Sequence, residues 1–445
     1  MLIKNNQEFI GRVAIITKKE VFYYSDYLNL FEKNKDILMS IKGKSIGLLK
    51  LSSIDIAKIL PLLVGWVKSI VFIPSNVTQS DLDVIGIGRY IDSYLAFTDG
   101  QWCLVEEKNK TKNFDSEELY NTEIVIPTSG TTATPKLVRH SLDSLTRTVK
   151  SNTSIGGNSR WALSYQLDRF AGLQVFLQSY LSGSSIVIPD GIDEFRNKLK
   201  FFGENKCTCM SATPTFWRMA IMYGVKRLIP QLKIITLGGE ISNQEILDKL
   251  KNIYPTSKIT HIYASTEAGV GFSVSDGFAG FPISYMRNGL NKIKLDVSES
   301  STLLIKNSCS SQSYVGRDDL VNSEGFIDSG DIIKVTENRV YFLGRCSGAI
   351  NVGGNKVMPE EVESVLLGNL NVKLCRVYAK KNSIMGSLVC CDISFYENGN
   401  NIGEMKKDLI EYCKARLDDF KIPVIYRVVD EVEIRVNDNG KMIRQ

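Results

Sequence analysis

The sequence predicts an α/β protein with a large N-terminal domain of packed β-sheets and helical layers, followed by a small α+β domain. Three observations support this fold class. The chain has 445 residues, which is long for a single hydrophobic core. Short apolar runs alternate with longer amphipathic segments, a pattern typical of parallel sheets covered by helices. Beyond residue 331 the pattern changes to closely spaced strands and turns.

The N-terminal part supplies the alternating elements. Short runs rich in β-branched residues predict buried strands at residues 45–49, 69–73, 185–188, 233–237 and 258–262. Apolar residues at helical spacing predict helices at 141–150 and 243–253. Strands and helices that alternate in this way predict parallel sheets with helices on their faces.

The C-terminal part is predicted to be a second compact unit. A hairpin is expected at 332–335 and 340–343, then a helix at 359–367, strands near 375–378 and 388–393, a helix at 401–417 and a final strand before residue 437. The boundary is predicted directly after Arg345. The two domains are therefore residues 1–345 and 346–445.

Composition excludes several classes of protein. A formal charge of +5 is small for this length and its basic residues are scattered, so we expect no nucleic-acid partner. The most apolar stretch, residues 59–74, is interrupted by Lys68 and is too short to span a membrane, and the first ten residues are too polar for a secretory signal. Nine cysteines without paired C-x-x-C units argue against a disulfide framework or a zinc site. The chain is expected to be cytoplasmic.

The most informative motif is residues 128–136, a loop of small and hydroxyl-bearing residues that follows an apolar run and ends in a lysine, as a phosphate-binding loop does. Its candidate phosphate-binding residues are Thr128, Ser129, Gly130, Thr131, Thr132 and Lys136. Backbone N–H groups, hydroxyls and one ammonium can all donate to an anion here. The loop is not a Walker A motif, because Pro135 stands where that motif has its second glycine.

This loop resembles the phosphate loop of the adenylate-forming superfamily, [ST]-S-G-[ST]-T-G-x-P-K, with Ala133 in place of a glycine. Four further segments match in the same order: 263–267, 328–331, 344–363 with its glycines and acidic helix start, and 439–441. The chain is most similar to the shorter bacterial acyl-CoA ligases, such as the o-succinylbenzoate–CoA ligases.

The resemblance implies an ATP-dependent acid–thiol ligase that uses Mg²⁺. A small carboxylic acid would attack the α-phosphate of ATP to give an acyl-adenylate, and a thiol, most simply that of CoA, would then take the acyl group. An alternative is a stand-alone adenylation enzyme that loads an acyl or aminoacyl group onto the phosphopantetheine of a carrier protein. A non-enzymatic alternative is a degenerate nucleotide-binding module, which the altered residues Ala133, Ser347 and Gly348 suggest.

By resemblance, each nucleotide-site residue has an expected role. Lys441 would bridge the carboxylate and the α-phosphate, Thr266 would meet the α-phosphate, and Glu267 would hold Mg²⁺. Adenine would lie between Tyr263 and the Gly238, Gly239 and Glu240 turn. Asp331 and Arg345 would bind the ribose hydroxyls, for which a carboxylate acceptor is suited.

The remaining roles concern the acid and the thiol. Gly353 and Gly354 resemble the loop that lines the thiol tunnel, and Ser347 stands at the hinge about which the mobile C-terminal domain swings. Arg169 and Gly172 fall on an acyl-pocket motif, H-x-x-G, in which a permanent cation replaces histidine. Arg169 therefore predicts an acid with a second anionic or strongly polar group. Phe170 stands where amino-acid adenylation domains carry an aspartate, which argues against an α-amino acid.

Overall fold

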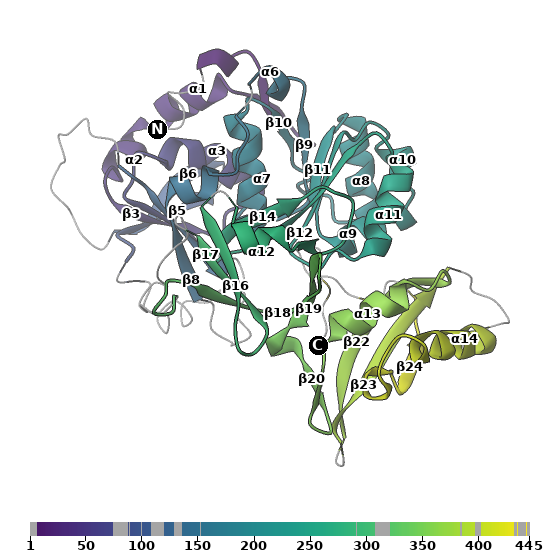
Figure 1. Ribbon diagram of the computed structural model, residues 1–445. Coiled ribbons are helices and arrows are strands. Elements are labelled where there is room, and N and C mark those ends of the chain that lie inside the picture. Colours follow the sequence, from purple (N-terminus) through teal and green to yellow (C-terminus); the bar gives the residue numbers. More distant parts are fainter. Residues whose placement is uncertain are drawn as a thin grey trace.

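A computed structural model shows four β-sheets with helices packed between and around them (Figure 1). It describes residues 7–73, 88, 90–98, 100–107, 120–128, 136–151, 153–290, 292–307, 321–382, 385–396, 402–430, 434 and 442. Among these residues, no helix is long and apolar enough to cross a membrane.

The first sheet has six strands in the order β6-β5-β3-β4-β7-β8. Their bounds are β3 (Ser45–Leu49), β4 (Ser69–Ile73), β5 (Ser93–Thr98), β6 (Gln101–Glu107), β7 (Glu123–Thr128) and β8 (Lys136–His140). The inner pairs are parallel and the two edge pairs are antiparallel. Every residue of β4 is buried, as expected of a β-branched strand covered on both faces. Strand β7 ends at Thr128, where the predicted phosphate loop begins.

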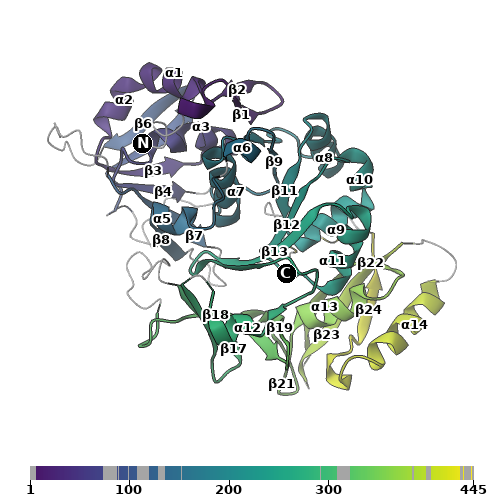
Figure 2. The same cartoon turned by 45° about the horizontal axis from the view of Figure 1, so that its top comes forward.

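The second sheet has eight strands in the order β14-β13-β12-β11-β9-β10-β1-β2. Their bounds are β1 (Val13–Ile16), β2 (Val21–Tyr23), β9 (Arg160–Leu163), β10 (Ser185–Val187), β11 (Cys209–Ala212), β12 (Ile234–Gly238), β13 (Lys258–Ser265) and β14 (Gly269–Val274). Only the edge strands β2 and β14 run antiparallel to their neighbours. Figure 2 shows the two sheets as separate layers with helices between them.

Helices fill the space between these sheets and cover their outer faces. Their bounds are α1 (Asp26–Lys33), α2 (Lys35–Ser40), α3 (Ser53–Leu63), α5 (Leu142–Thr146), α6 (Thr153–Gly156), α7 (Phe170–Leu181), α8 (Phe195–Glu204), α9 (Pro214–Met222), α10 (Val225–Leu228), α11 (Gln244–Ile253) and α12 (Ser284–Asn288). Helices α3 and α7 share one apolar cluster with both sheets. Helices α8 to α11 pack on the other face of the eight-stranded sheet.

Two helix starts show how local sequence sets these elements. Ser52 and Asp55 form a capping box at α3, each side chain accepting a backbone N–H of the other residue. Thr213 caps α9 by accepting the N–H of Phe216, and Pro214 occupies the first turn, where its missing N–H costs nothing.

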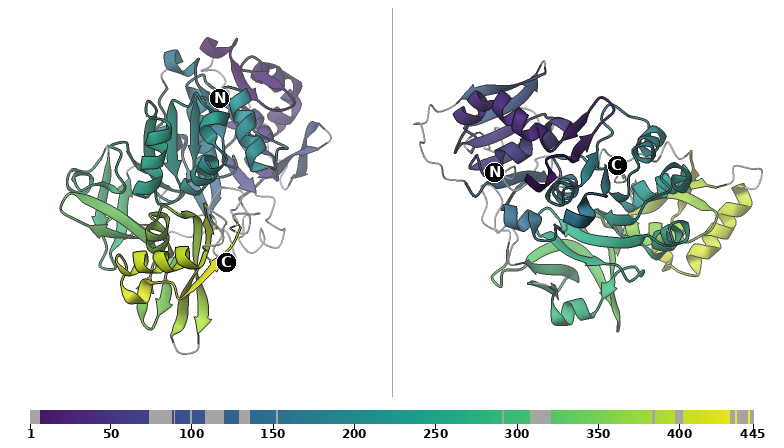
Figure 3. Two further views of the ribbon diagram at one scale, coloured as in Figure 1. Left: turned by 90° about the vertical axis from the view of Figure 1, so that its right-hand side faces the viewer. Right: turned by 90° about the horizontal axis from the view of Figure 1, so that it is seen from above.

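The other two sheets follow in the chain. The third, of order β15-β19-β18-β17-β16, is antiparallel and comprises β15 (Phe281–Pro282), β16 (Ile293–Val297), β17 (Thr302–Asn307), β18 (Ile327–Val335) and β19 (Arg339–Arg345). The fourth comprises β20 (Ile350–Val352), β21 (Asn355–Val357), β22 (Val372–Asn382), β23 (Gly386–Phe395) and β24 (Ile425–Val428), with α13 (Pro359–Leu367) and α14 (Ile402–Lys414) packed on one face. Figure 3 shows this last unit at the opposite end of the molecule from the N-terminal strands and helices.

Most predicted elements appear within a few residues of their expected ends. Strands β3 and β4 and helix α13 have the predicted bounds, and α11 differs by one residue because Asn243 caps it. The predicted helix at 141–150 is wrong in length: α5 ends at Thr146. Beyond it, Thr148 and Val149 are β-branched residues, which favour a helix less than the residues before them.

Candidate functional site

Most of the predicted site residues that the structure describes line one cavity of about 1420 Å³. It lies between α7, one face of the eight-stranded sheet, the antiparallel sheet and α13. The predicted residues that line it are Thr128, Arg169, Gly238, Gly239, Glu240, Tyr263, Thr266, Glu267, Asp331, Arg345 and Ser347. Residues from β7, β12, β13, β18 and β19 thus meet, although more than 200 positions separate Thr128 from Arg345.

The pair predicted to bind a ribose is formed. Asp331 and Arg345 are opposite each other in the register of β18 and β19, and Arg345 Nε donates to Asp331 Oδ1 at 2.9 Å. The other carboxylate oxygen, Oδ2, accepts the phenol of Tyr263 at 2.5 Å. Each oxygen has a further lone pair, so the carboxylate can still accept from a diol.

Tyr263 is held in an aromatic stack. Its ring lies nearly parallel to Phe342, with centroids 4.8 Å apart, and to Phe272 at 5.3 Å. Burial, and then the adjacent Asp331 carboxylate, raise the pKa of the Tyr263 phenol well above its ordinary value, so the phenol stays protonated and remains a donor. The ring is therefore positioned by partners that the sequence motif alone does not identify.

The Gly238, Gly239 and Glu240 turn follows directly after β12. Gly239 has φ +80°, a conformation that residues with a Cβ rarely adopt, which explains a glycine at this position. The Glu240 carboxylate accepts the N–H of Thr215 at 2.9 Å in the first turn of α9 and the N–H of Met442 at 3.1 Å. Glu240 thereby joins the N-terminal part of the molecule to the C-terminal tail, inside the cavity.

Arg169 precedes α7 and lies beside the end of β7. Its Nη1 approaches the carbonyl of Pro127 at 3.5 Å, and its Nε is 3.7 Å from the Asp168 carboxylate. Asp168 therefore balances part of the charge of the Arg169 guanidinium. The Arg169 side chain keeps 26% of its surface exposed and lines the cavity, so it can still meet a substrate group.

Glu267 is one of the carboxylates that line the cavity. Four others, Glu240, Asp331, Glu361 and Glu363, accept hydrogen bonds from protein donors. Glu267 interacts electrostatically with the Arg345 guanidinium, and within the described part of the chain no group of three His, Cys, Asp or Glu side chains could hold a metal by itself. A single carboxylate fits Mg²⁺, which is usually held by one or two carboxylates together with substrate phosphates and water.

Some predicted residues lie outside the described part of the chain. These are Ser129, Gly130, Thr131, Thr132 and Lys441, together with the side chain of Lys136. The described residues on either side give their surroundings. Thr128 lines the cavity before the loop, and Met442 lines it after Lys441.

Three predicted residues do not line the cavity. Gly172 is buried in α7, and a Cβ there would lie 2.0 Å from the carbonyl oxygen of Gln166. The absence of a side chain at Gly172 is explained by this close packing, and its place in the substrate pocket stays a prediction. Gly353 and Gly354 form the turn between β20 and β21 and stand away from the cavity in this arrangement. Ser347, by contrast, lies at its edge.

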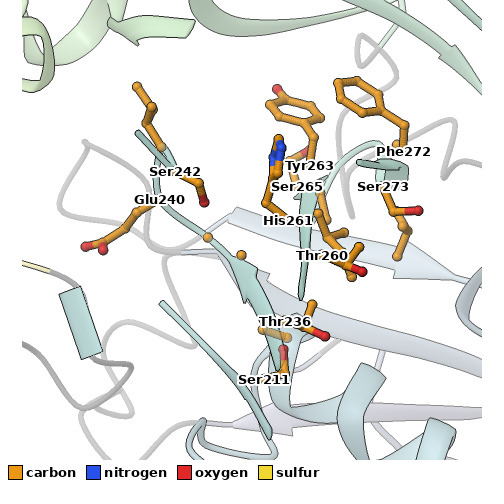
Figure 4. Close-up of a pocket in the computed structure, with 18 of the residues that line it drawn as sticks. Ser211, Thr236, Glu240, Ser242, Thr260, His261, Tyr263, Ser265, Phe272 and Ser273 are labelled. Atoms are coloured by element: carbon orange, nitrogen blue, oxygen red, sulfur yellow. The ribbon is translucent and has the colours of Figure 1, made fainter. Parts of the chain in front are cut away.

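The sequence interpretation missed a set of hydroxyl-bearing residues on the floor of the cavity. Ser211, Thr236 and Thr260 come from β11, β12 and β13, and Figure 4 shows them in the same pocket as Glu240 and Tyr263. The sequence does carry one indication of this set, because each of three successive strands has a hydroxyl-bearing residue among its apolar residues. The strand register needed to align them cannot be read from any one strand.

The family comparisons agree with this arrangement. Residues 87–289 match the family described as AMP-binding enzyme, and residues 361–441 match the AMP-binding enzyme C-terminal domain. The two matched regions together cover more than half of the chain.

Relatives and solved structures agree with the family matches. The 2-succinylbenzoate–CoA ligase of Bacillus licheniformis is 25% identical over 349 residues, covering 74% of this chain and 70% of that protein. Bacitracin synthase 3 of Bacillus licheniformis is 23% identical over 373 residues, covering 77% of this chain and 6% of that protein. The structure of o-succinylbenzoate CoA synthetase from Bacillus subtilis, in complex with the acyl-adenylate intermediate, has a TM-score of 0.72 and 18% identity, and covers all of this chain and 96% of the other. This chain belongs to the AMP-binding enzymes, the adenylate-forming superfamily that its motifs resemble.

Proposed function

We propose that the chain activates a small carboxylic acid with ATP and transfers the resulting acyl group to the thiol of CoA. The observation that carries this proposal is the convergence of the Asp331–Arg345 pair, the Gly239 turn and Glu267 on one cavity. The named relatives include a CoA ligase, which has the same overall reaction. The proposed enzyme would work in the cytoplasm.

The proposed chemistry develops negative charge on phosphate oxygens, so the site needs fixed donors and cations rather than a covalent nucleophile. Asp331 would accept the ribose hydroxyls, and Thr266 would donate to the α-phosphate. Mg²⁺ held by Glu267 would neutralise charge on the departing pyrophosphate. Arg169 would contact the acid, and Lys441 would donate to the oxygens that join carboxylate and phosphate.

We infer that the chain is divided into residues 1–345 and 346–445 and that it turns about Ser347 between half-reactions. The described arrangement suits the first half-reaction, because Met442 is held at Glu240 while Gly353 and Gly354 are turned away. Rotation would exchange these two segments, so that the glycines could approach a pantetheine chain closely.

ATP–pyrophosphate exchange with a panel of carboxylic acids tests the activation step. Acid-dependent exchange is expected, followed by thioester formation when CoA is added. No exchange with any aryl, keto, hydroxy, dicarboxylic or alkyl acid would contradict the proposal.

The match to bacitracin synthase 3 favours one second candidate, in which a carrier protein replaces CoA as acceptor. Incubation with ATP, the activated acid and either CoA or a phosphopantetheine-bearing carrier protein separates the two. Loading of the carrier without any CoA thioester would replace CoA as acceptor and leave the activation step intact.

Arg169 gives a prediction about the acid. In Arg169→His, the preference for a dicarboxylic over a matched monocarboxylic acid is expected to fall by about tenfold, because a hydrogen-bonding cation is lost. The ratio of kcat/KM values in pyrophosphate exchange measures it. Asp168→Asn is the matched control: it keeps the cation and should keep or increase the preference. An unchanged ratio in Arg169→His would show that the second group binds elsewhere.

Glu240 gives a prediction about the C-terminal tail. Glu240→Ala removes the acceptor for Met442 N–H, so acyl-adenylate formation is expected to fall by about tenfold, while thiolysis of supplied acyl-adenylate is retained. Separate assays of the two half-reactions measure this difference. Glu240→Gln keeps a side-chain oxygen acceptor and should be less affected. Equal loss in both half-reactions would indicate that Glu240 contacts the nucleotide instead.

A further inference from the structure

The floor of the cavity carries hydroxyl groups in an ordered row. Ser211 is paired with Thr236 in the register of β11 and β12, and Thr236 is paired with Thr260 in the register of β12 and β13. Paired residues on neighbouring strands point to the same face of a sheet. Because neighbouring strands are about 4.8 Å apart, the row extends for about 10 Å. Figure 4 shows all three side chains in the pocket.

The opposite face of these strands is apolar. Met210, Ile235, Leu237 and Ile259 alternate with the hydroxyl row and pack into the apolar cluster beneath α9 and α11. The hydroxyl face is turned toward α7, because Ile262, which shares that face, packs in the cluster that contains α7. The hydroxyl-bearing residues are therefore confined to the face of these strands that lines the cavity.

Thr236 is the central member of the row and the most informative one. Only 7% of its surface is exposed, and it lines the cavity. Its backbone carbonyl accepts the indole N–H of Trp217 at 3.1 Å. Valine would fill the same space in a β-strand and would pack as well as threonine. The position therefore retains a hydrogen-bonding group where packing does not need one.

Ser211 is linked to the Gly238 turn through Tyr165. The phenol of Tyr165 interacts with Ser211 and approaches the carbonyl of Gly238 at 3.5 Å. Burial raises the pKa of the Tyr165 phenol, so it stays protonated and can donate. The hydroxyl row is thus continuous with the Gly238 turn, because Thr236 lies two residues before Gly238 on the same face of β12.

We propose that Ser211, Thr236 and Thr260 form the part of the acid subsite that reads the acyl chain, and that they select an acid whose chain carries hydroxyl or keto oxygens over a plain alkyl acid. This inference rests on the proposed activation of a carboxylic acid. The hydroxyls would exchange hydrogen bonds with substrate oxygens, and an alkyl chain would leave Thr236 buried and unpaired. A site built to hydrogen-bond a substrate oxygen discriminates strongly against an analogue that lacks it.

Pyrophosphate exchange with pairs of acids of equal chain length tests the proposal. Each pair comprises an alkyl acid and its hydroxy or keto derivative, with positions varied along the chain. The parent enzyme is expected to favour at least one oxygenated member by about tenfold or more in kcat/KM. Thr236→Val should remove most of this preference by slowing the oxygenated acid without slowing the alkyl acid. Thr236→Ser, which keeps the hydroxyl, should retain it.

The outcomes distinguish this inference from the proposed function. Exchange that is equally fast with both members of every pair would overturn the hydroxyl-row proposal while leaving carboxylate activation intact. A preference that survives in Thr236→Val would also overturn it, since another surface would then read the chain. If no acid supports exchange, the proposed function fails, and the hydroxyl-row proposal fails with it. Circular dichroism and thermal unfolding of both variants check that they are folded.

Discussion

Replacing Lys441 with alanine is expected to lower acyl-adenylate formation by about 10²–10³-fold, the loss typical of one missing transition-state donor. The ammonium would neutralise charge as the carboxylate meets the α-phosphate. The next residue, Met442, lines the cavity and donates its backbone N–H to the Glu240 carboxylate. The rate of acid-dependent pyrophosphate exchange measures the effect.

The same variant should retain the second half-reaction, because the tail is expected to leave the cavity when the C-terminal unit turns. Thiolysis of supplied acyl-adenylate by CoA measures this step in isolation. Lys407→Ala, which removes an exposed lysine from α14, is the matched control and should affect neither step. Equal losses in both half-reactions of Lys441→Ala would show that the lysine does not serve adenylation alone.

Elements with strong local signals were predictable from the sequence. Helix α13 begins at Pro359, whose fixed φ suits a first helical turn, and its bounds are as predicted. Strands β3 and β4 are uninterrupted apolar runs and also have the predicted bounds. The predictions of an α/β fold and of the adenylate-forming superfamily are confirmed by the sheet architecture and the family matches. The domain boundary and the individual residue roles stay predictions.

What the sequence could not supply depends on contacts between distant segments. Gly172 matches a pocket motif, but its glycine is required by the backbone of Gln166. Tyr263 matches an adenine-binding motif, but the motif does not reveal that Phe272 and Phe342 stack with it. In both cases the partners of the residue are fixed only by tertiary packing.

Glu267→Gln is expected to weaken the response to Mg²⁺ and to lower turnover at a fixed Mg²⁺ concentration by about 10²-fold, because the charge that holds the metal is removed while the shape is kept. Four further carboxylates of the cavity, Glu240, Asp331, Glu361 and Glu363, already accept hydrogen bonds from N–H, O–H or ammonium donors, so they are poor substitutes. Initial rates of acyl-adenylate formation over a range of Mg²⁺ at fixed ATP measure the shift. Glu337→Gln, an exposed residue in the turn between β18 and β19, is the matched control. If Glu267→Gln showed the parent's Mg²⁺ dependence and turnover, Glu267 would be structural, and the metal would have to be held by other residues together with the phosphates.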